Sequence, residues 1–246
     1  MHSVLNDELA LGLAPVAVFF TDEKPEGALQ FQAGRRGCVV SLLVAVAREG
    51  KPAAFDRATT GCPGGLIGLE MADTWSHPED MAHFLSVGGG PSGREGEGYL
   101  KSPEVARAFM AAMGAVDEPH RYRVLKPLAD VDPERETPRL VVFLANPDQI
   151  SALTVLANYE RGTGDAVVVR FGSGCQSVCL LPDRLAQETP PRAVLGLIDI
   201  TVRALVPADV LSFTVPWAMF LEMEGNVRGS FFDRKDWRAL KGRLGG

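Results

Sequence analysis

The sequence lacks two features that would assign it to a broad class of partner. It has no excess of positive charge: 25 Lys and Arg against 31 Asp and Glu give a net charge of −6. The charges are scattered, without the basic stripe typical of nucleic-acid binders. It also has no long apolar run, since the longest, residues 38–47, is too short to cross a bilayer. We therefore predict neither nucleic-acid binding nor membrane insertion.

The N-terminus lacks the pattern of a secretory signal. Asp7 and Glu8 stand where a signal peptide would carry basic residues. This pattern predicts a cytoplasmic protein. Because thiols are kept reduced in the cytoplasm, we expect the four cysteines to be free, metal-liganding or catalytic rather than paired in disulfides.

Several well-known catalytic and nucleotide-binding motifs are absent or out of context. No GxSxG elbow is present, which argues against a serine hydrolase, and the histidines are not spaced as HExxH. Gly88, Gly90 and Gly93 satisfy GxGxxG, but no predicted strand leads into them and no helix follows at once. The Gly-rich segment 86–98 is instead predicted to be a flexible loop, or a lid that orders on a ligand.

The hydrophobic pattern predicts an α+β protein with one domain over residues 1–246. A hydrophobic content of 46% is enough for a sizeable core. Apolar runs and turn signals predict strands at 15–20, 53–59, 139–144, 165–171, 196–205 and 211–215. Helices are predicted at 6–13, 38–49, 66–71, 103–113, 149–159, 216–224 and 233–240. Residues 115–138, which are polar and contain prolines, are predicted to be a linker.

Two parts of the chain share one order of features, which suggests an internal repeat. Each has a strand, a polar turn with proline, a helix, a second strand, a Gly-Cys turn and another helix. The pattern predicts two similar strand–helix–strand lobes, about 14–114 and 139–246, that share a mixed or antiparallel sheet. Further strands and helices would follow at the C-terminus. Cys62 and Cys175 would then occupy equivalent turns.

Three of the four cysteines directly follow a glycine at a predicted turn or helix start. They are Cys38, Cys62 and Cys175. Free N–H groups and the positive end of a helix dipole stabilise a thiolate, the form that binds metals. Glycine beside the sulfur lets the backbone approach a bulky cofactor closely. Arginine beside the sulfur adds positive charge, which favours an anionic cofactor. The residues expected to line such a cofactor are Gly61, Gly64, Gly65, Gly174 and Arg36.

The order of these motifs resembles the domain of unknown function 169 family of bacterial and archaeal proteins. The matching stretches are PVAVFFTDEKPEG, the run from Cys38 through VVSLLVAVAREGK, GCPGGLIGLE, EGEGYLKSPEVARAF, FLANPDQISAL, FGSGCQS and IDITVRALVPADVLSFTVP. The resemblance implies a single repeated unit and draws attention to the three cysteines. It implies no particular reaction or substrate.

Three functions remain open from the residues. The first is an iron–sulfur cluster on the three cysteines, in a redox or Lewis-acid role, with Cys179 or a substrate at the fourth position. Zinc is the second choice of metal, with a histidine or water completing its coordination. The second function, the alternative to a metal site, is that of a metal-free protein that binds a small molecule or anion, with the cysteines in its core. The third is a thiol enzyme with one activated cysteine. A small-molecule ligand or a redox partner is expected.

Overall fold

The computed structural model describes residues 1–244, and the chain divides into two compact units. Unit 1 comprises Met1–Leu69 and the chain from His120 onward, and unit 2 comprises Glu70–Pro119. Within residues 1–244, no helix has both the length and the apolar character needed to cross a bilayer.

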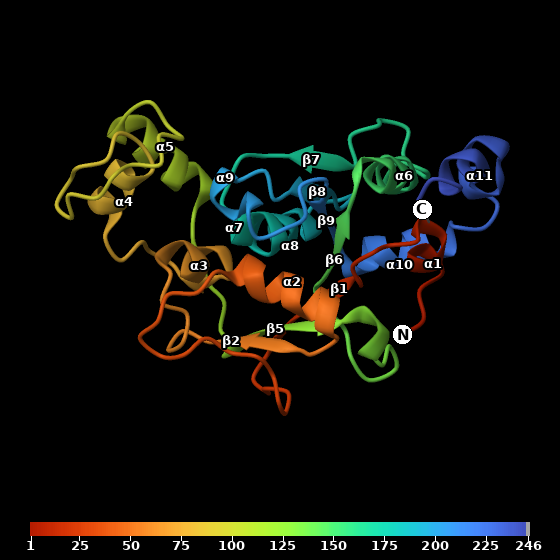
Figure 1. Ribbon diagram of the computed structural model, residues 1–246, viewed down its shortest axis with the longest axis horizontal. Helices are drawn as coiled ribbons and strands as arrows, with labels where there is room; N and C mark the ends of the chain where they lie inside the picture. Colours follow the sequence, from red (N-terminus) through yellow and green to blue (C-terminus); the bar gives the residue numbers. More distant parts are fainter. Residues whose placement is uncertain (245–246) are drawn as a thin grey trace. The chain divides into compact units, whose positions relative to one another are not determined.

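Unit 1 is built on a seven-stranded mixed sheet with the strand order β2-β5-β1-β6-β9-β8-β7 (Figure 1). Neighbouring strands are antiparallel, except for β7 and β8, which are parallel. The predicted α+β class with a mixed sheet is therefore confirmed. The strands are β1 (Val16–Thr21), β2 (Ala53–Phe55), β5 (Tyr122–Pro127), β6 (Leu140–Ala145), β7 (Val167–Val169), β8 (Ala193–Gly196) and β9 (Leu211–Pro216).

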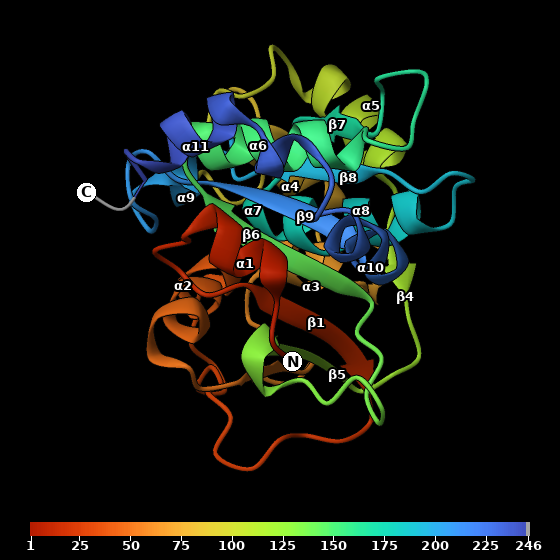
Figure 2. The same cartoon turned by 90° about the vertical axis from the view of Figure 1, so that its right-hand side faces the viewer.

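Helices cover both faces of this sheet. In Figure 2, α1, α6 and α10 lie in front of the central strands, and α2, α7 and α8 lie behind them. Because both faces are covered, β6 is apolar throughout, whereas β9 alternates the buried polar Ser212 and Thr214 with Phe213 and Val215. The helices of unit 1 are α1 (Val4–Leu9), α2 (Val39–Glu49), α3 (Pro63–Gly68), α6 (Pro147–Ala157), α7 (Gly174–Val178), α8 (Leu180–Ala186), α9 (Ile200–Arg203), α10 (Trp217–Gly225) and α11 (Lys235–Lys241), with 3-10 turns η1 (Leu128–Asp130) and η2 (Phe231–Asp233).

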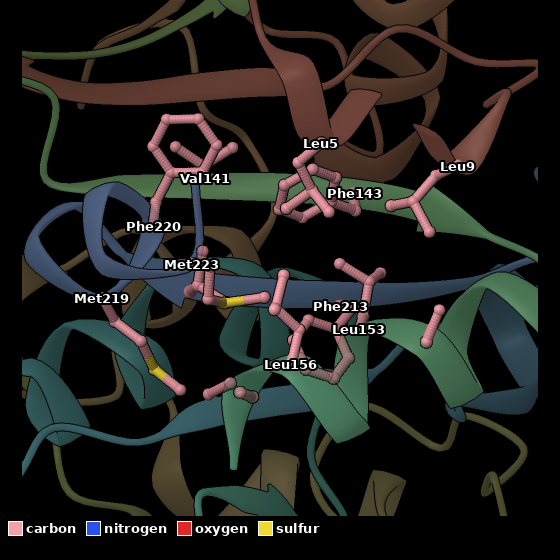
Figure 3. Close-up of a cluster of buried hydrophobic side chains, with 14 of the residues drawn as sticks. Leu5, Leu9, Val141, Phe143, Leu153, Leu156, Phe213, Met219, Phe220 and Met223 are labelled. Carbon is pink, nitrogen blue, oxygen red and sulfur yellow. The ribbon is translucent and has the colours of Figure 1, made fainter. Parts of the chain in front are cut away.

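The front face of the sheet carries a large apolar cluster. Alternate residues of β6 and β9, such as Phe143 and Phe213, point into it and are fully buried. Figure 3 shows them packed against side chains of α1, α6 and α10, among them Leu153 and Phe220. Each such side chain contributes about 1.5–3 kcal/mol when it is removed from water. This cluster fixes the sheet, whose opposite face carries the cysteines.

Unit 2 is a small helical unit closed by a two-stranded ladder. Its elements are β3 (Met71–Ala72), α4 (Pro78–Phe84), α5 (Pro103–Met113) and β4 (Val116–Asp117). Ser102 caps α5, as predicted, by accepting a hydrogen bond from the N–H of Val105. The Gly-rich segment 86–98 folds back on α4: the Ser86 hydroxyl donates to the carbonyl of Ala82, and Glu97 N–H donates to Phe84.

The prediction of a linker at residues 115–138 was wrong, because this segment contains β5. That strand lies between β1 and β2 and pairs with β1 over six residues. The sequence disguised it because Arg123, which looks solvent-exposed, is fully buried. Its guanidinium donates to the carbonyls of Leu69 and His120, both at 2.7 Å, and lies 4.5 Å from the centre of the Phe20 ring.

The predicted strand at 196–205 was also wrong. β8 ends at Gly196, and Ile200–Arg203 form the short helix α9. The reason is local: the Asp199 carboxylate caps α9 by accepting hydrogen bonds from the N–H and the hydroxyl of Thr201. The helix predicted at 66–71 begins earlier, at Pro63, so GCPGG enters the helix rather than forming a separate turn.

The internal repeat is not confirmed. Both halves run strand, helix, strand, helix: β1-α2-β2-α3 and β6-α6-β7-α7. However, α2 lies on the same face as α7, and α6 lies on the opposite face (Figure 2). A two-fold axis that exchanges the antiparallel neighbours β1 and β6 is perpendicular to the sheet. It would place the equivalent helices α2 and α6 on the same face, which is not observed. The duplication therefore stays a prediction.

Candidate functional site

The N-terminal ends of α2, α3 and α7 meet on the rear face of the sheet in unit 1. Cys38 is the N-cap of α2, and Cys62 is the N-cap of α3. Cys175 is the second residue of α7, whose N-cap is Ser173. The structure thus brings together the three cysteines that the sequence singled out, each at the start of a helix.

The contact between α3 and α7 is unusually close. The Cys175 thiol donates to the carbonyl oxygen of Gly64 at 3.2 Å, and the Ser173 hydroxyl lies 3.2 Å from the same sulfur. A Cβ atom added at Gly68 would lie 2.5 Å from the Cys175 sulfur, which is closer than Cβ atoms approach other heavy atoms in proteins. Gly68 is therefore a site residue that the sequence reading missed. Its signal was the glycine spacing of GCPGGLIG, in which Gly64 and Gly68 share one face of a helix.

Gly174 holds α2 and α9 against the start of α7. A Cβ there would lie 2.8 Å from Val40 and 3.1 Å from Val202. Its N–H donates to the carboxylate of Asp199 at 3.1 Å. Gly174 is thus needed for close packing beside Cys175, rather than for open space in front of it.

The glycines of GCPGG differ in their surroundings. A Cβ at Gly61 would lie 2.9 Å from the carbonyl of Arg35, so this glycine admits the Arg35–Arg36 backbone. A Cβ at Gly65 would meet Thr60, Cys62 and Val39 side chains at 3.2–3.7 Å.

Gly64 is the open position of this group. Its absent Cβ has one neighbour within 4 Å, the Cys62 sulfur at 3.9 Å. A Cβ at this position would therefore fit without displacing another segment. The side chains of Arg35 and Arg36, whose backbone meets Gly61, are exposed.

The sulfurs of the three cysteines influence one another electrostatically. Burial, with smaller contributions from the nearby Cys62 and Cys38, raises the pKa of the Cys175 thiol to about 12, against the lowering effect of the Ser173 hydroxyl. Burial also raises the pKa of Cys38, as do Cys62 and Asp199, although the N–H groups at the start of α2 lower it. Without a bound cation, Cys175 is therefore a protonated thiol at neutral pH, which does not fit an activated nucleophile.

Asp199 is a second residue that the sequence reading did not place at the site. It is 4% exposed, and its carboxylate accepts from Gly174 and from both donors of Thr201. The available signal was an Asp two residues before a Thr, which is typical of a helix N-cap. Arg203, four residues further along, donates to the backbone carbonyls of Leu197, Ala208 and Val210.

The remaining candidate ligands do not complete a site for a single ion. Across residues 1–244, no three His, Cys, Asp or Glu side chains are placed to hold a metal ion. Cys179 is buried between α7 and α8, and its N–H donates to the carbonyl of Cys175. All four cysteines are free thiols.

Comparison with known proteins places the chain in a family. No curated protein and no solved structure matches it. Residues 4–226 match the family model DUF169, described as uncharacterised ArCR, so the match includes all three helix-start cysteines. The chain therefore belongs to the domain of unknown function 169 family.

Proposed function

We propose that Cys38, Cys62 and Cys175 hold an iron–sulfur cluster that serves redox or Lewis-acid chemistry. The supporting observation is the convergence of three sulfurs whose charges act on one another, although they come from well-separated segments of the chain. Thiolates are the usual ligands of such clusters. Three protein ligands leave a fourth position for a substrate or another donor.

The hydrogen-bond donors around the sulfurs fit an anionic group. The N–H groups of Val40 and Ser41 lower the pKa of Cys38, and the hydroxyl of Ser173 and the N–H of Gln176 lower that of Cys175. N–H groups directed at sulfur stabilise the thiolate and tune a cluster's potential. A bound cation replaces the thiol proton, so metal binding offsets the burial that keeps Cys175 protonated.

A cluster fits the cysteines better than a single zinc ion does. Four thiolates around one zinc, at Zn–S distances of about 2.3 Å, stand only about 4 Å apart. Residues 1–244 contain no three side chains arranged to hold one ion. A cluster contains several irons and sulfides, so its protein ligands are further apart. The exposed arginines Arg35 and Arg36, whose backbone packs against Gly61, suit a bulky anionic group.

The proposal is tested on protein purified without oxygen and reconstituted with iron and sulfide. We expect a brown protein with stoichiometric iron and labile sulfide. Cys38→Ser, Cys62→Ser and Cys175→Ser should each lose most of the iron. Cys179→Ser is the matched control and should keep it. Equal iron content in the wild type and all three Ser variants would contradict the proposal.

The second candidate is a metal-free protein that binds a small anion. It is favoured by the first turns of α2 and α3, where Cys38 and Cys62 make no side-chain capping hydrogen bond. Protein that stays colourless after reconstitution supports this candidate, provided that phosphate slows amide exchange at residues 38–41 and 61–65. If the protein is colourless and phosphate does not slow this exchange, both the cluster and the anion site are excluded.

A further inference from the structure

The loops at 160–165 and 188–192 and helix α10 line a pocket in unit 1, on the right-hand side of Figure 2. Its volume is about 580 Å³. Pockets that bind small molecules have volumes of about 300–1,000 Å³. No cysteine of the described chain lines this pocket, so what it binds is independent of the proposed cluster.

Arg161 lines this pocket with most of its hydrogen-bond donors unused. Its side chain is only 7% exposed, and among residues 1–244 its guanidinium makes one hydrogen bond, from Nη1 to the carbonyl of Pro191 at 2.8 Å. The Glu222 carboxylate lies 3.6 Å from Nη2, which is an ion pair but is too long for a hydrogen bond. A guanidinium has five N–H donors, and leaving them unpaired in a buried place is costly. The Nε and Nη2 donors therefore call for an acceptor in the pocket, and a carboxylate, which accepts two parallel bonds, matches them best.

Two carboxylates of the same pocket have no ion-pair partner within residues 1–244. Glu160 accepts a hydrogen bond from the neutral amide of Asn226 at 2.6 Å, and Asp165 accepts one from the hydroxyl of Thr163. That hydroxyl is the largest cause of the lowered pKa of Asp165, which is therefore ionised at neutral pH. Both carboxylates are thus negatively charged and free to pair with a cation.

The charge balance of the lining selects the ligand. The pocket is lined by four carboxylates and two guanidiniums. One of these carboxylates, Glu188, is already paired with Arg192 at 2.6 Å. A simple anion such as phosphate would meet an excess of negative charge, which disfavours it. A ligand with one carboxylate and two ammonium groups matches the unused guanidinium edge and the two unpaired carboxylates.

We propose that this pocket binds a free amino acid that carries a second ammonium group on its side chain, as lysine does. Arg161 binds the carboxylate of the ligand, and Asp165 and Glu160 bind its two ammonium groups. The buried guanidinium gives the site its specificity, because it separates an amino acid from a simple diamine. The acidic side chains separate it from an amino acid whose side chain is uncharged.

Isothermal titration calorimetry of the full chain with L-lysine is the first test, and two analogues dissect the binding. Cadaverine is lysine without its carboxylate, and norleucine is lysine without its side-chain ammonium group. Each analogue should bind at least about tenfold more weakly than lysine, because each loses one charge-assisted contact. Cadaverine that binds as tightly as lysine would show an acidic surface only and would overturn the inference. So would the absence of lysine binding.

Three variants test the residues. Arg161→Lys keeps the charge but loses the planar fork, so it should weaken lysine binding about tenfold and leave cadaverine binding unchanged. Asp165→Asn should weaken both ligands, and it should fold normally because Asp165 is exposed. Asp209→Asn is the matched control, since Asp209 is an exposed acid that lines a different pocket, and its lysine affinity should be that of the wild type. Wild-type lysine affinity in Asp165→Asn would overturn the inference even if Arg161→Lys fails to fold.

Discussion

The thiol of Cys175 donates a hydrogen bond to the carbonyl of Gly64 at 3.2 Å, although the two residues are 111 positions apart. This contact joins the start of α7 to the first turn of α3, the helix that Cys62 caps. It depends on Gly68, one turn further along α3, because any Cβ at that position would meet the Cys175 sulfur. The cysteine site therefore depends on helix packing that glycine alone permits.

Gly68→Ala should destabilise the protein. The added Cβ would lie 2.5 Å from the Cys175 sulfur and 2.9 Å from the backbone nitrogen of Gln176, so α3 and α7 must move apart. Overpacking of this kind costs about 1–3 kcal/mol of unfolding free energy. Urea denaturation measures the change. Gly12→Ala is the control, because its Cβ would meet nothing within 4 Å. Equal midpoints for the two variants would disprove the tight contact.

The raised pKa of Cys175 predicts a loss of stability at alkaline pH. The folded protein holds this proton up to a pKa of about 12, whereas the ordinary value is 9.0. Stability is therefore complete below about pH 9 and falls as the pH rises toward 12, because the unfolded chain loses the proton first. The loss reaches at most about 4 kcal/mol. Denaturation from pH 8 to 10.5 should show a shallower decline in Cys175→Ala, and identical declines would contradict the assignment.

Asp199→Asn should make Cys38 more reactive. The carboxylate of Asp199 raises the pKa of Cys38, although burial is the larger cause. Asn keeps an oxygen that caps α9 but removes the charge that opposes a thiolate. We expect alkylation of Cys38 to rise by about two- to threefold at pH 7.5, because the pKa of its thiol falls. Measurement of the Cys38 peptide by mass spectrometry checks this, and an unchanged or slower rate would argue against the charge coupling.

Arg123→Met should strongly destabilise unit 1. The guanidinium is fully buried and donates to the carbonyls of Leu69 and His120, the residues that flank unit 2 in the chain. Methionine fills the space but leaves both acceptors without this donor, at a cost of about 1–3 kcal/mol for each. Arg121→Met is the control, because Arg121 is exposed and its loss should cost less than about 1 kcal/mol. A similar melting temperature for both variants would contradict the role of Arg123.

Much of the fold was readable from the sequence where the signals were local. The apolar runs at β1, β6 and β9 and the capped starts of α5 and α6 lie within a residue or two of their predicted positions. Two elements were predicted wrongly. β5 was missed because its buried arginine reads as polar, and α9 was read as a strand because Asp199 and Arg203 alternate with apolar residues.

The candidate site was partly readable as well. A glycine before each of Cys38, Cys62 and Cys175 indicated sulfurs at helix starts, since capping acts over three or four residues. Gly68 and Asp199 gave only the weaker signals of a glycine spacing and of an Asp two residues before a Thr. Their importance comes from neighbours that are distant in the chain.

The sequence by itself determined most of the strands and helices and placed cysteines at the starts of three helices, because periodicity and capping act between near neighbours. Only the tertiary structure decided that these three starts meet on one face of the sheet. That meeting depends on close approaches at Gly68 and Gly174, which bring α3, α7 and α2 together. It also depends on the sheet, against which the helices pack. The sequence pattern does not show which distant segments pack together.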